Sequence, residues 1–128
     1  PSMAITLRLL PDEFTICRLA ASEAVPAWAG SSAFSCITRT ADELSVICPT
    51  AQVPATVKHE SGWRLLKLAG PFAFTETGIL ASVLAPLAAD RISILATSTF
   101  DTDYVLVKGG QLEAARRSLT RAGHQVLE

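Results

Sequence analysis

The sequence is poor in several features that mark common protein classes. It has three cysteines, 6% aromatic residues and a formal net charge of -1 over 128 residues. A balanced charge and few aromatic rings offer little to attract or stack bases, so we expect no nucleic-acid partner. Cys17, Cys36 and Cys48 have no CxxC spacing and lie in apolar runs, which favours buried structural thiols over disulfides or zinc ligands.

Long apolar segments are also missing. No apolar run approaches the about 18 residues that are needed to cross a bilayer. The first residues lack the basic start and the long apolar stretch of a secretory signal. We therefore expect no membrane partner and a cytoplasmic location. Apolar residues still make up 49% of the chain, which is enough for the core of one compact domain or two small ones.

Motifs that carry catalysis are absent from the sequence. There is no nucleophile elbow, P-loop or nucleotide-binding glycine pattern, and no cysteine stands beside an identifiable base. His59 and His124 are far apart and lack ligand spacing, so we interpret them as solvated or core histidines. The sequence therefore predicts a protein that is not an enzyme and that holds no cofactor or metal.

The N-terminal half is rich in strand patterns. Residues 4–10 and 14–20 alternate in part and are separated by Pro11-Asp12, which predicts a hairpin. Two β-rich runs, residues 34–39 and 44–48, flank the turn-forming segment 40–43 and predict a second hairpin.

From Trp63 onward, strand and helix patterns alternate. We predict strands at 63–69, 91–98, 103–107 and 124–127, a helix that begins near Thr77, and a second helix over 111–122. Pro86 is expected to bend or end the first helix, because proline donates no amide to the preceding turn. The resulting order βαββαβ predicts an antiparallel four-stranded sheet with two helices on one face, the ferredoxin-like arrangement.

An internal repeat relates the two halves. A shift of 59 positions aligns Thr38 with Thr97, Thr40 with Thr99 and Asp42 with Asp101. We therefore predict an α+β fold of two ferredoxin-like units, residues 1–62 and 63–128, with antiparallel sheets and helices on one face. The first unit is expected to be degenerate, because residues 14–20 form a strand where the second unit has a helix.

The stretch STFDTDYVLV, residues 98–107, carries more polar groups than a strand start needs. In the βαββαβ order, the loop at 70–78 and the turn at 99–103 emerge at the same end of the sheet. The helix start offers free amides to a carboxylate, and Gly78 permits close approach to the backbone. Across the gap, Asp103 and Glu76 suit an ammonium or guanidinium group, and Ser98 and Thr99 offer hydroxyls.

This arrangement predicts a site for a zwitterion, whose groups would satisfy the spare polar atoms. Simpler roles exist for the same residues. Asp101 and Asp103 can cap a tight turn, Thr75 and Thr77 can be helix N-caps, and Glu76 can complement the helix dipole. In that case an exposed sheet edge would make the protein an assembly module without a ligand.

The segment GPFAFTETGILASVLAPLAADRISILATSTFDTDYVLV, followed by LEAARRSLTRAGHQV, resembles the ACT domain. It is most similar to small bacterial tandem-ACT proteins related to the cytosolic arginine sensors of animal cells. The resemblance extends over nearly all of the chain through RLLPDEFTICRL, PAWA, FSCITRTADELSVICP and GWRLLKLAGP.

The resemblance implies a regulatory fold that binds amino acids at interfaces between ACT units and often pairs sheets into dimers. We therefore expect an amino-acid ligand and a homodimer formed through sheet edges or helices. The sensors contain more ACT units than this chain, so a full pocket of their kind would use a second copy. The family's ligand positions match eight residues of this sequence, and the polar turn adds Ser98. The expected ligand site is therefore Phe74, Thr75, Glu76, Gly78, Ile79, Ser98, Thr99, Phe100 and Asp103.

Overall fold

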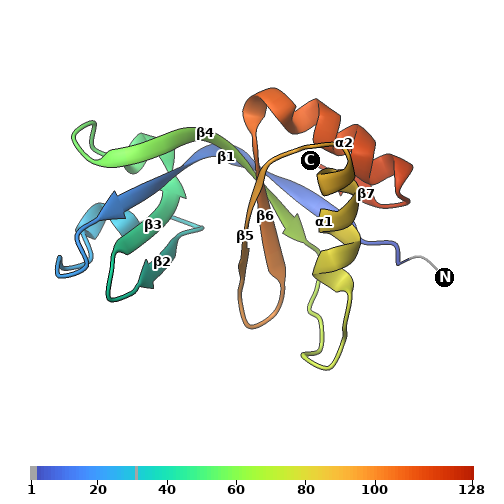
Figure 1. Ribbon diagram of the computed structural model, residues 1–128, viewed down its shortest axis with the longest axis horizontal. Coiled ribbons are helices and arrows are strands. Elements are labelled where there is room, and N and C mark those ends of the chain that lie inside the picture. The colour runs from blue at the N-terminus through green and yellow to red at the C-terminus, as the bar shows by residue number, and fades with distance from the viewer. Residues whose placement is uncertain (1–2, 31) are drawn as a thin grey trace. The chain divides into compact units, whose positions relative to one another are not determined.

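The computed structural model describes residues 3–30 and 32–128 and divides the chain into two compact units (Figure 1). Unit 1 comprises Pro1–Pro11 and Arg64–Glu128, and unit 2 comprises Asp12–Trp63. Two strands, β1 (Thr6–Leu19) and β4 (Lys58–Leu68), each contribute one half to either unit. The expected boundary at 62/63 lies within one residue of the second junction. Residues 3–11, assigned from the sequence to the N-terminal unit, lie in unit 1.

The expected hairpin over residues 4–20 is wrong, because β1 is one continuous strand. The strand β7 (Gln125–Leu127) pairs with residues 6–8, and β3 (Leu44–Pro49) pairs with residues 14–19. Residues 9–13 lie between these two ladders and pair with neither strand. Pro11 sits in this stretch, where its missing amide removes no hydrogen bond of either ladder. Proline therefore does not end the strand.

Unit 1 has the βαββαβ order that the sequence predicts. The elements that follow β4 are α1 (Ile79–Ala89), β5 (Ile94–Ser98), β6 (Asp103–Lys108), the 3-10 turn η3 (Gly109–Gln111), α2 (Leu112–Arg121) and β7. The strand order, however, is β7-β1-β4-β6-β5. The start of the chain is inserted between the first and last strands of the unit. The expected four-stranded antiparallel sheet is therefore corrected to a sheet with an added strand, in which β7 runs parallel to β1.

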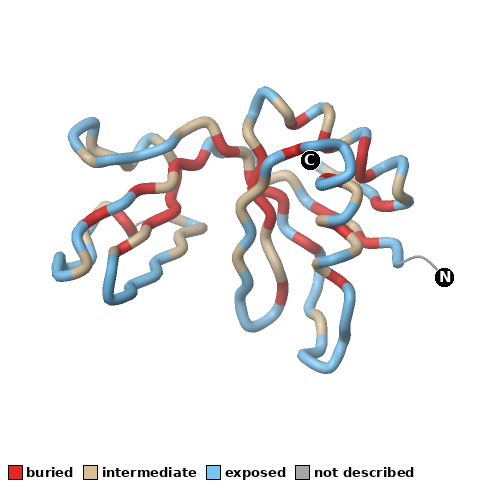
Figure 2. The backbone as a smooth tube through the Cα atoms, in the orientation of Figure 1, coloured by how far each residue is buried: buried red, intermediate tan, exposed pale blue. Residues whose placement is uncertain are grey.

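The core of unit 1 lies between the sheet and its two helices (Figure 2). Helix α1 buries Ile79, Val83 and Leu87, whose spacing of four places them on one face. Helix α2 adds a second apolar face, and β1, β4 and β6 supply the sheet side. The buried residues from these other elements and from the segments next to them are Ile5, Leu7, Leu66, Leu68, Ile92, Val105, Val107, Leu112, Ala115 and Leu119. Within the described residues, no helix is both long and apolar enough to span a membrane.

Pro86 does not end α1, which continues to Ala89. A proline at this position leaves the carbonyl of Ser82 without the amide that a helix normally provides. The Nε2 atom of His124 lies 2.8 Å from that carbonyl oxygen and replaces the missing donor. His124 is 5% exposed, which confirms the core histidine interpretation for this residue.

Unit 2 has strands but no α-helix among its described residues. It contains β2 (Cys36–Arg39), β3, the second half of β1, the first half of β4, and the 3-10 turns η1 (Ala27–Gly30) and η2 (Thr50–Gln52). The expected hairpin over 34–48 is confirmed, since β2 and β3 pair antiparallel with Arg39 opposite Leu44.

The sequence predicts buried thiols, which is confirmed for Cys17 and Cys48 and wrong for Cys36, which is only partly buried. Cys17 and Cys48 are buried in the core of the unit with Leu19, Leu44 and Val46. Burial, with a smaller contribution from the nearby Cys48, raises the pKa of Cys17 to about 11. Burial also raises the pKa of Cys48. Both thiols therefore stay protonated near neutral pH and act as small apolar side chains.

Candidate functional site

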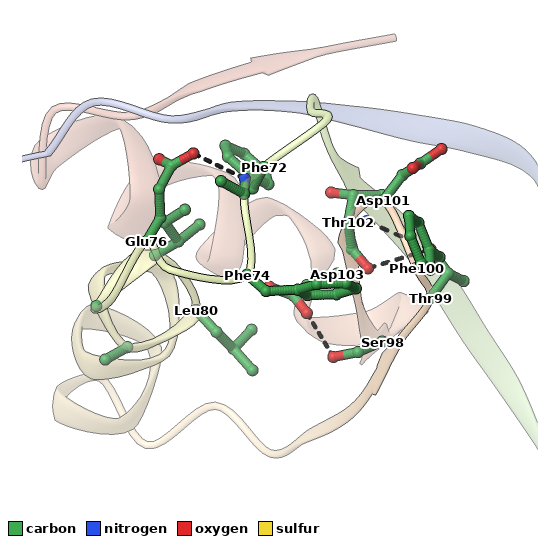
Figure 3. Close-up of a pocket in the computed structure, with 14 residues that line it drawn as sticks. Phe72, Phe74, Glu76, Leu80, Ser98, Thr99, Phe100, Asp101, Thr102 and Asp103 are labelled. Atoms are coloured by element: carbon green, nitrogen blue, oxygen red, sulfur yellow. Dashed lines mark hydrogen bonds between the residues drawn. The ribbon is translucent and has the colours of Figure 1, made fainter.

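A cavity of about 330 Å³ opens in unit 1 at the end of the sheet where β4 leads into α1 (Figure 3). Three segments form its walls: the loop before α1, the first turn of α1, and the turn between β5 and β6. The lining residues are Phe72, Ala73, Phe74, Glu76, Gly78, Ile79, Leu80, Ala81, Ser98, Thr99, Phe100, Asp101, Thr102 and Asp103.

The loop before α1 is attached to the β5–β6 turn at two points. The amide of Phe72 donates to the carbonyl of Asp101 at 2.9 Å. A Cβ atom at position 70 would lie 3.0 Å from that carbonyl, so Gly70 allows the two segments to approach. Further along, the rings of Phe74 and Phe100 meet edge to face with centroids 4.9 Å apart. These rings are 75% and 80% exposed, so the pair lies at the rim of the cavity.

The start of α1 faces the cavity without a side-chain cap. The N-cap is Gly78, which has a φ of 80° and makes no side-chain hydrogen bond. Thr75 and Thr77 are therefore not N-caps, contrary to the simpler interpretation of the sequence. A glycine fits here because the left-handed conformation strains residues with a Cβ atom. The uncapped amides of the first turn and the positive end of the helix dipole favour an anion at this wall.

The polar residues of the β5–β6 turn bond largely to each other. The Ser98 hydroxyl donates to Oδ1 of Asp103. The amide of Thr99 donates to the carbonyl of Thr102 at 2.8 Å, and the Thr102 hydroxyl donates to the carbonyl of Leu68 at 2.6 Å. The hydroxyls of Ser98, Thr99 and Thr102 therefore already donate within the protein, and they can still accept hydrogen bonds. The Asp103 carboxylate retains capacity, because it can accept several hydrogen bonds and uses one here.

Glu76 stabilises its own loop. Its Oε1 atom accepts the amide of Ala73 at 2.9 Å, and its backbone amide donates to the carbonyl of Ala73 at 2.9 Å. The carboxylate thus closes a local turn next to the cavity. Its carboxylate adds negative charge to a cavity that Asp103 also lines, and this charge favours a cationic group on the ligand.

Eight of the nine residues expected in the ligand site line the cavity; the exception is Thr75. Sequence reasoning missed six lining residues: Phe72, Ala73, Leu80, Ala81, Asp101 and Thr102. Leu80 and Ala81 could have been included from their place in the first turn of the predicted helix. Phe72 lines the cavity because its backbone amide bonds to the turn between β5 and β6, and no pattern of residues in the sequence reveals this hydrogen bond. In the described part of the chain, no cluster of His, Cys, Asp and Glu could hold a metal ion.

Unit 1 is a mixed α/β domain, with the ferredoxin-like element order and a cavity between a helix start and a hairpin turn. A family model of the ACT domain matches residues 58–121, which is half of the chain. The chain belongs to the ACT domain family. A second model, of an N-terminal domain, matches residues 12–56, most of unit 2.

Two proteins of known structure share the fold of this chain. A protein from Agobacterium tumefaciens is 46% identical, with a TM-score of 0.94 and coverage of 98% of this chain and 94% of that one. The regulatory subunit of aspartate kinase from Thermus thermophilus shares the fold at 10% identity, with a TM-score of 0.63 and coverage of 91% and 96%.

A curated relative is similar over a short segment only. The human "cytosolic arginine sensor for mTORC1 subunit 1" is 46% identical over 46 residues, which is 35% of this chain. The match spans 14% of the sensor's own length.

Proposed function

We propose that the protein is a non-catalytic regulatory protein that binds a free amino acid in the cavity of unit 1. One observation carries the proposal: the uncapped start of α1 and the Ser98–Asp103 pair are walls of the same cavity. One wall suits an anion and the other suits a cation, and an amino acid carries both. The ACT family membership and the names of the aspartate kinase regulatory subunit and the arginine sensor support an amino-acid ligand.

The two charges of the ligand have separate partners in this proposal. Its carboxylate accepts hydrogen bonds from the first-turn amides of α1, residues 79–81. Its ammonium group donates to the free capacity of Asp103. The cavity volume of about 330 Å³ is at the lower end of the range for small-molecule sites, which fits one amino acid. Phe74 and Phe100 cover the ligand side chain at the rim, and the charge of Glu76 favours a basic or simply zwitterionic ligand.

We further propose a cytoplasmic homodimer of tandem ACT-type units. The strand β5 ends the strand order of unit 1, so its outer edge is available for pairing with a second copy. Sedimentation velocity should then give a mass near twice the 13.6 kDa of the chain. A mass of one chain would remove the dimer from the proposal without affecting the ligand.

The ligand is tested by thermal unfolding with each of the twenty amino acids. A ligand that binds only the folded state at 100 times its Kd stabilises by about 2.7 kcal/mol, which raises Tm by several degrees. Asp103→Ala should abolish the shift and leave the fold intact. Asp42→Ala is the matched control, because Asp42 holds the corresponding position to Asp101 in the other hairpin and lines none of the cavity.

The alternative is an assembly module that pairs through an edge strand, either β5 in unit 1 or β2 in unit 2. This alternative predicts no thermal shift at millimolar concentrations of any amino acid. It also predicts that no amino acid changes the difference in Tm between Asp103→Ala and the parent protein.

A further inference from the structure

His124 joins three parts of unit 1 through its imidazole ring. Its Nδ1 atom lies 3.0 Å from the amide of Ile5, which precedes β1. Its Nε2 atom lies 2.8 Å from the carbonyl of Ser82 in α1. The residue itself follows α2 and precedes β7, and its backbone amide donates to the carbonyl of Leu119 at 2.9 Å.

The contact with Ser82 compensates for Pro86. In a regular helix, the carbonyl of residue 82 accepts the amide of residue 86. Pro86 has no amide hydrogen, so this buried carbonyl needs another donor. His124 supplies it from outside the helix. Ser82 comes directly after the first turn that lines the cavity, and its amide donates to the carbonyl of Gly78 at 2.9 Å.

The two partners of the ring fix its protonation state. The amide of Ile5 can only donate, so Nδ1 must carry a lone pair. The carbonyl of Ser82 can only accept, so Nε2 must carry the hydrogen. Only the neutral ring with hydrogen on Nε2 meets both requirements. A proton on Nδ1 would place two N–H groups against each other.

The elements that contact the His124 ring contain few charged side chains, and most of these form ion pairs with other residues. Helix α1, residues 3–7 and β7 contain no ionisable side chain. On α2, Arg116 pairs with Glu113 and Glu128, Arg121 pairs with Asp90, and Arg117 is exposed. Among the residues that the structure describes, no ion pair includes His124. No neighbouring carboxylate therefore offers the protonated ring a compensating contact.

We propose that His124 is a positioning residue. Through the carbonyl that Pro86 leaves free, its ring holds α1, whose first turn lines the cavity, against the residue that precedes β1. The proposal concerns the helix itself and does not require that the cavity binds an amino acid.

The first experiment compares the thermal unfolding of two variants with that of the parent protein. His124→Gln loses the ring that contacts both Ile5 and Ser82, so we expect it to lower Tm by about 4 °C or more. His59→Gln is the control, because His59 is exposed and its substitution should leave Tm unchanged. An unchanged Tm for His124→Gln would overturn the proposal.

The second experiment asks whether His124 acts through the carbonyl that Pro86 leaves free. His124→Asn can keep an acceptor near Ile5 but cannot reach Ser82 with a donor. In the parent background this variant should increase hydrogen exchange of the α1 amides at residues 82–89 by about fivefold or more. With Pro86→Ala, the helix regains its own donor, so the same change should have little effect. An equal effect in both backgrounds would contradict the assigned role.

Discussion

The two hairpins of the molecule share one backbone design and differ in what surrounds it. In unit 2, Arg39 is opposite Leu44 where β2 and β3 meet; in unit 1, Ser98 is opposite Asp103 where β5 and β6 meet. These pairs are related by the 59-residue shift that the sequence repeat indicates. Both turns also begin with a threonine whose amide bonds across the turn, at 2.9 Å for Thr40 and 2.8 Å for Thr99.

The surroundings of the hairpins differ at three corresponding positions. The carbonyl of Asp42 accepts the Arg18 guanidinium, whereas the carbonyl of Asp101 accepts the amide of Phe72. Arg39 donates to the carbonyls of Ala21 and Glu23, at 2.8 Å for Glu23, whereas the corresponding Ser98 bonds to Asp103.

Position 44 is a fully buried leucine, and its counterpart is the half-exposed Asp103. Unit 2 thus closes its turn with its own side chains, and unit 1 leaves a cavity. We propose that the hairpin of unit 1 forms a ligand site because its closing pair is short and polar and a helix start faces it.

The largest expected effect comes from exchanging the residues at the closing pair. Leu44→Asp places a carboxylate in the core of unit 2 and should cost about 3 kcal/mol or more in free energy of unfolding. Asp103→Leu should cost less than about 1 kcal/mol, because its site is partly open to solvent, and should abolish the amino-acid thermal shift. Chemical denaturation measures both. Similar costs for the two substitutions would mean that the hairpins do not differ as described.

The cysteines test the closed character of unit 2. Because the pKa of Cys17 is raised to about 11 from 9.0, its thiolate fraction near pH 8 should fall about 100-fold. Thiol labelling should therefore modify the partly exposed Cys36 first and leave Cys17 and Cys48 protected. Uniform labelling of all three would contradict a closed core.

The same raised pKa predicts an alkaline effect with a definite sign. Folding favours the protonated Cys17 thiol, so its contribution to stability is present below about pH 9 and is lost as the pH rises toward 11. Unit 1 contains no cysteine and lacks this contribution. Hydrogen exchange at increasing pH should therefore show the thiol-dependent loss in unit 2, and Cys17→Ala should remove it.

The turn threonines should have smaller and unequal effects. The Thr40 hydroxyl accepts the amides of Asp42 and Glu43, both at 3.1 Å. The Thr99 hydroxyl accepts the amide of Thr102 at 3.4 Å. Thr40→Ala should thus cost about 1 kcal/mol and Thr99→Ala about half of that. Urea denaturation of the two variants measures the difference, and a larger cost for Thr99→Ala would reverse the comparison.

Arg39 should have the smallest effect on stability. Its hydrogen bonds to two carbonyls are exposed, so Arg39→Ala should cost about 0.5 kcal/mol or less. The variant should not acquire amino-acid binding, because Leu44 still supplies no carboxylate. Binding by the variant would show that Arg39 alone keeps unit 2 closed.

The sequence was sufficient for the element order of unit 1 and for the hairpin of unit 2, because apolar periodicity and turn residues are local signals. It also brought eight lining residues together, since βαββαβ connectivity places the loop and the turn at one end of a sheet. Sequence reasoning failed where contacts with a distant segment of the chain determine whether a strand or helix continues. Pro11 is tolerated because neither β7 nor β3 pairs with residues 9–13. Pro86 is tolerated because His124 donates a hydrogen bond to the carbonyl of Ser82. Neither compensation is visible within a short window of sequence.

The central claim is that the two hairpins differ in ligand binding, and an NMR titration of the whole chain tests it most directly. The amino acid that gives the largest thermal shift is added to ¹⁵N-labelled protein, and the amide signals are followed. We expect residues 78–81 and 98–103 to shift together with one dissociation constant, while residues 39–44 stay unchanged. Unmoved signals at 78–81 and 98–103 with all twenty amino acids, or equal shifts at residues 39–44, would contradict the account.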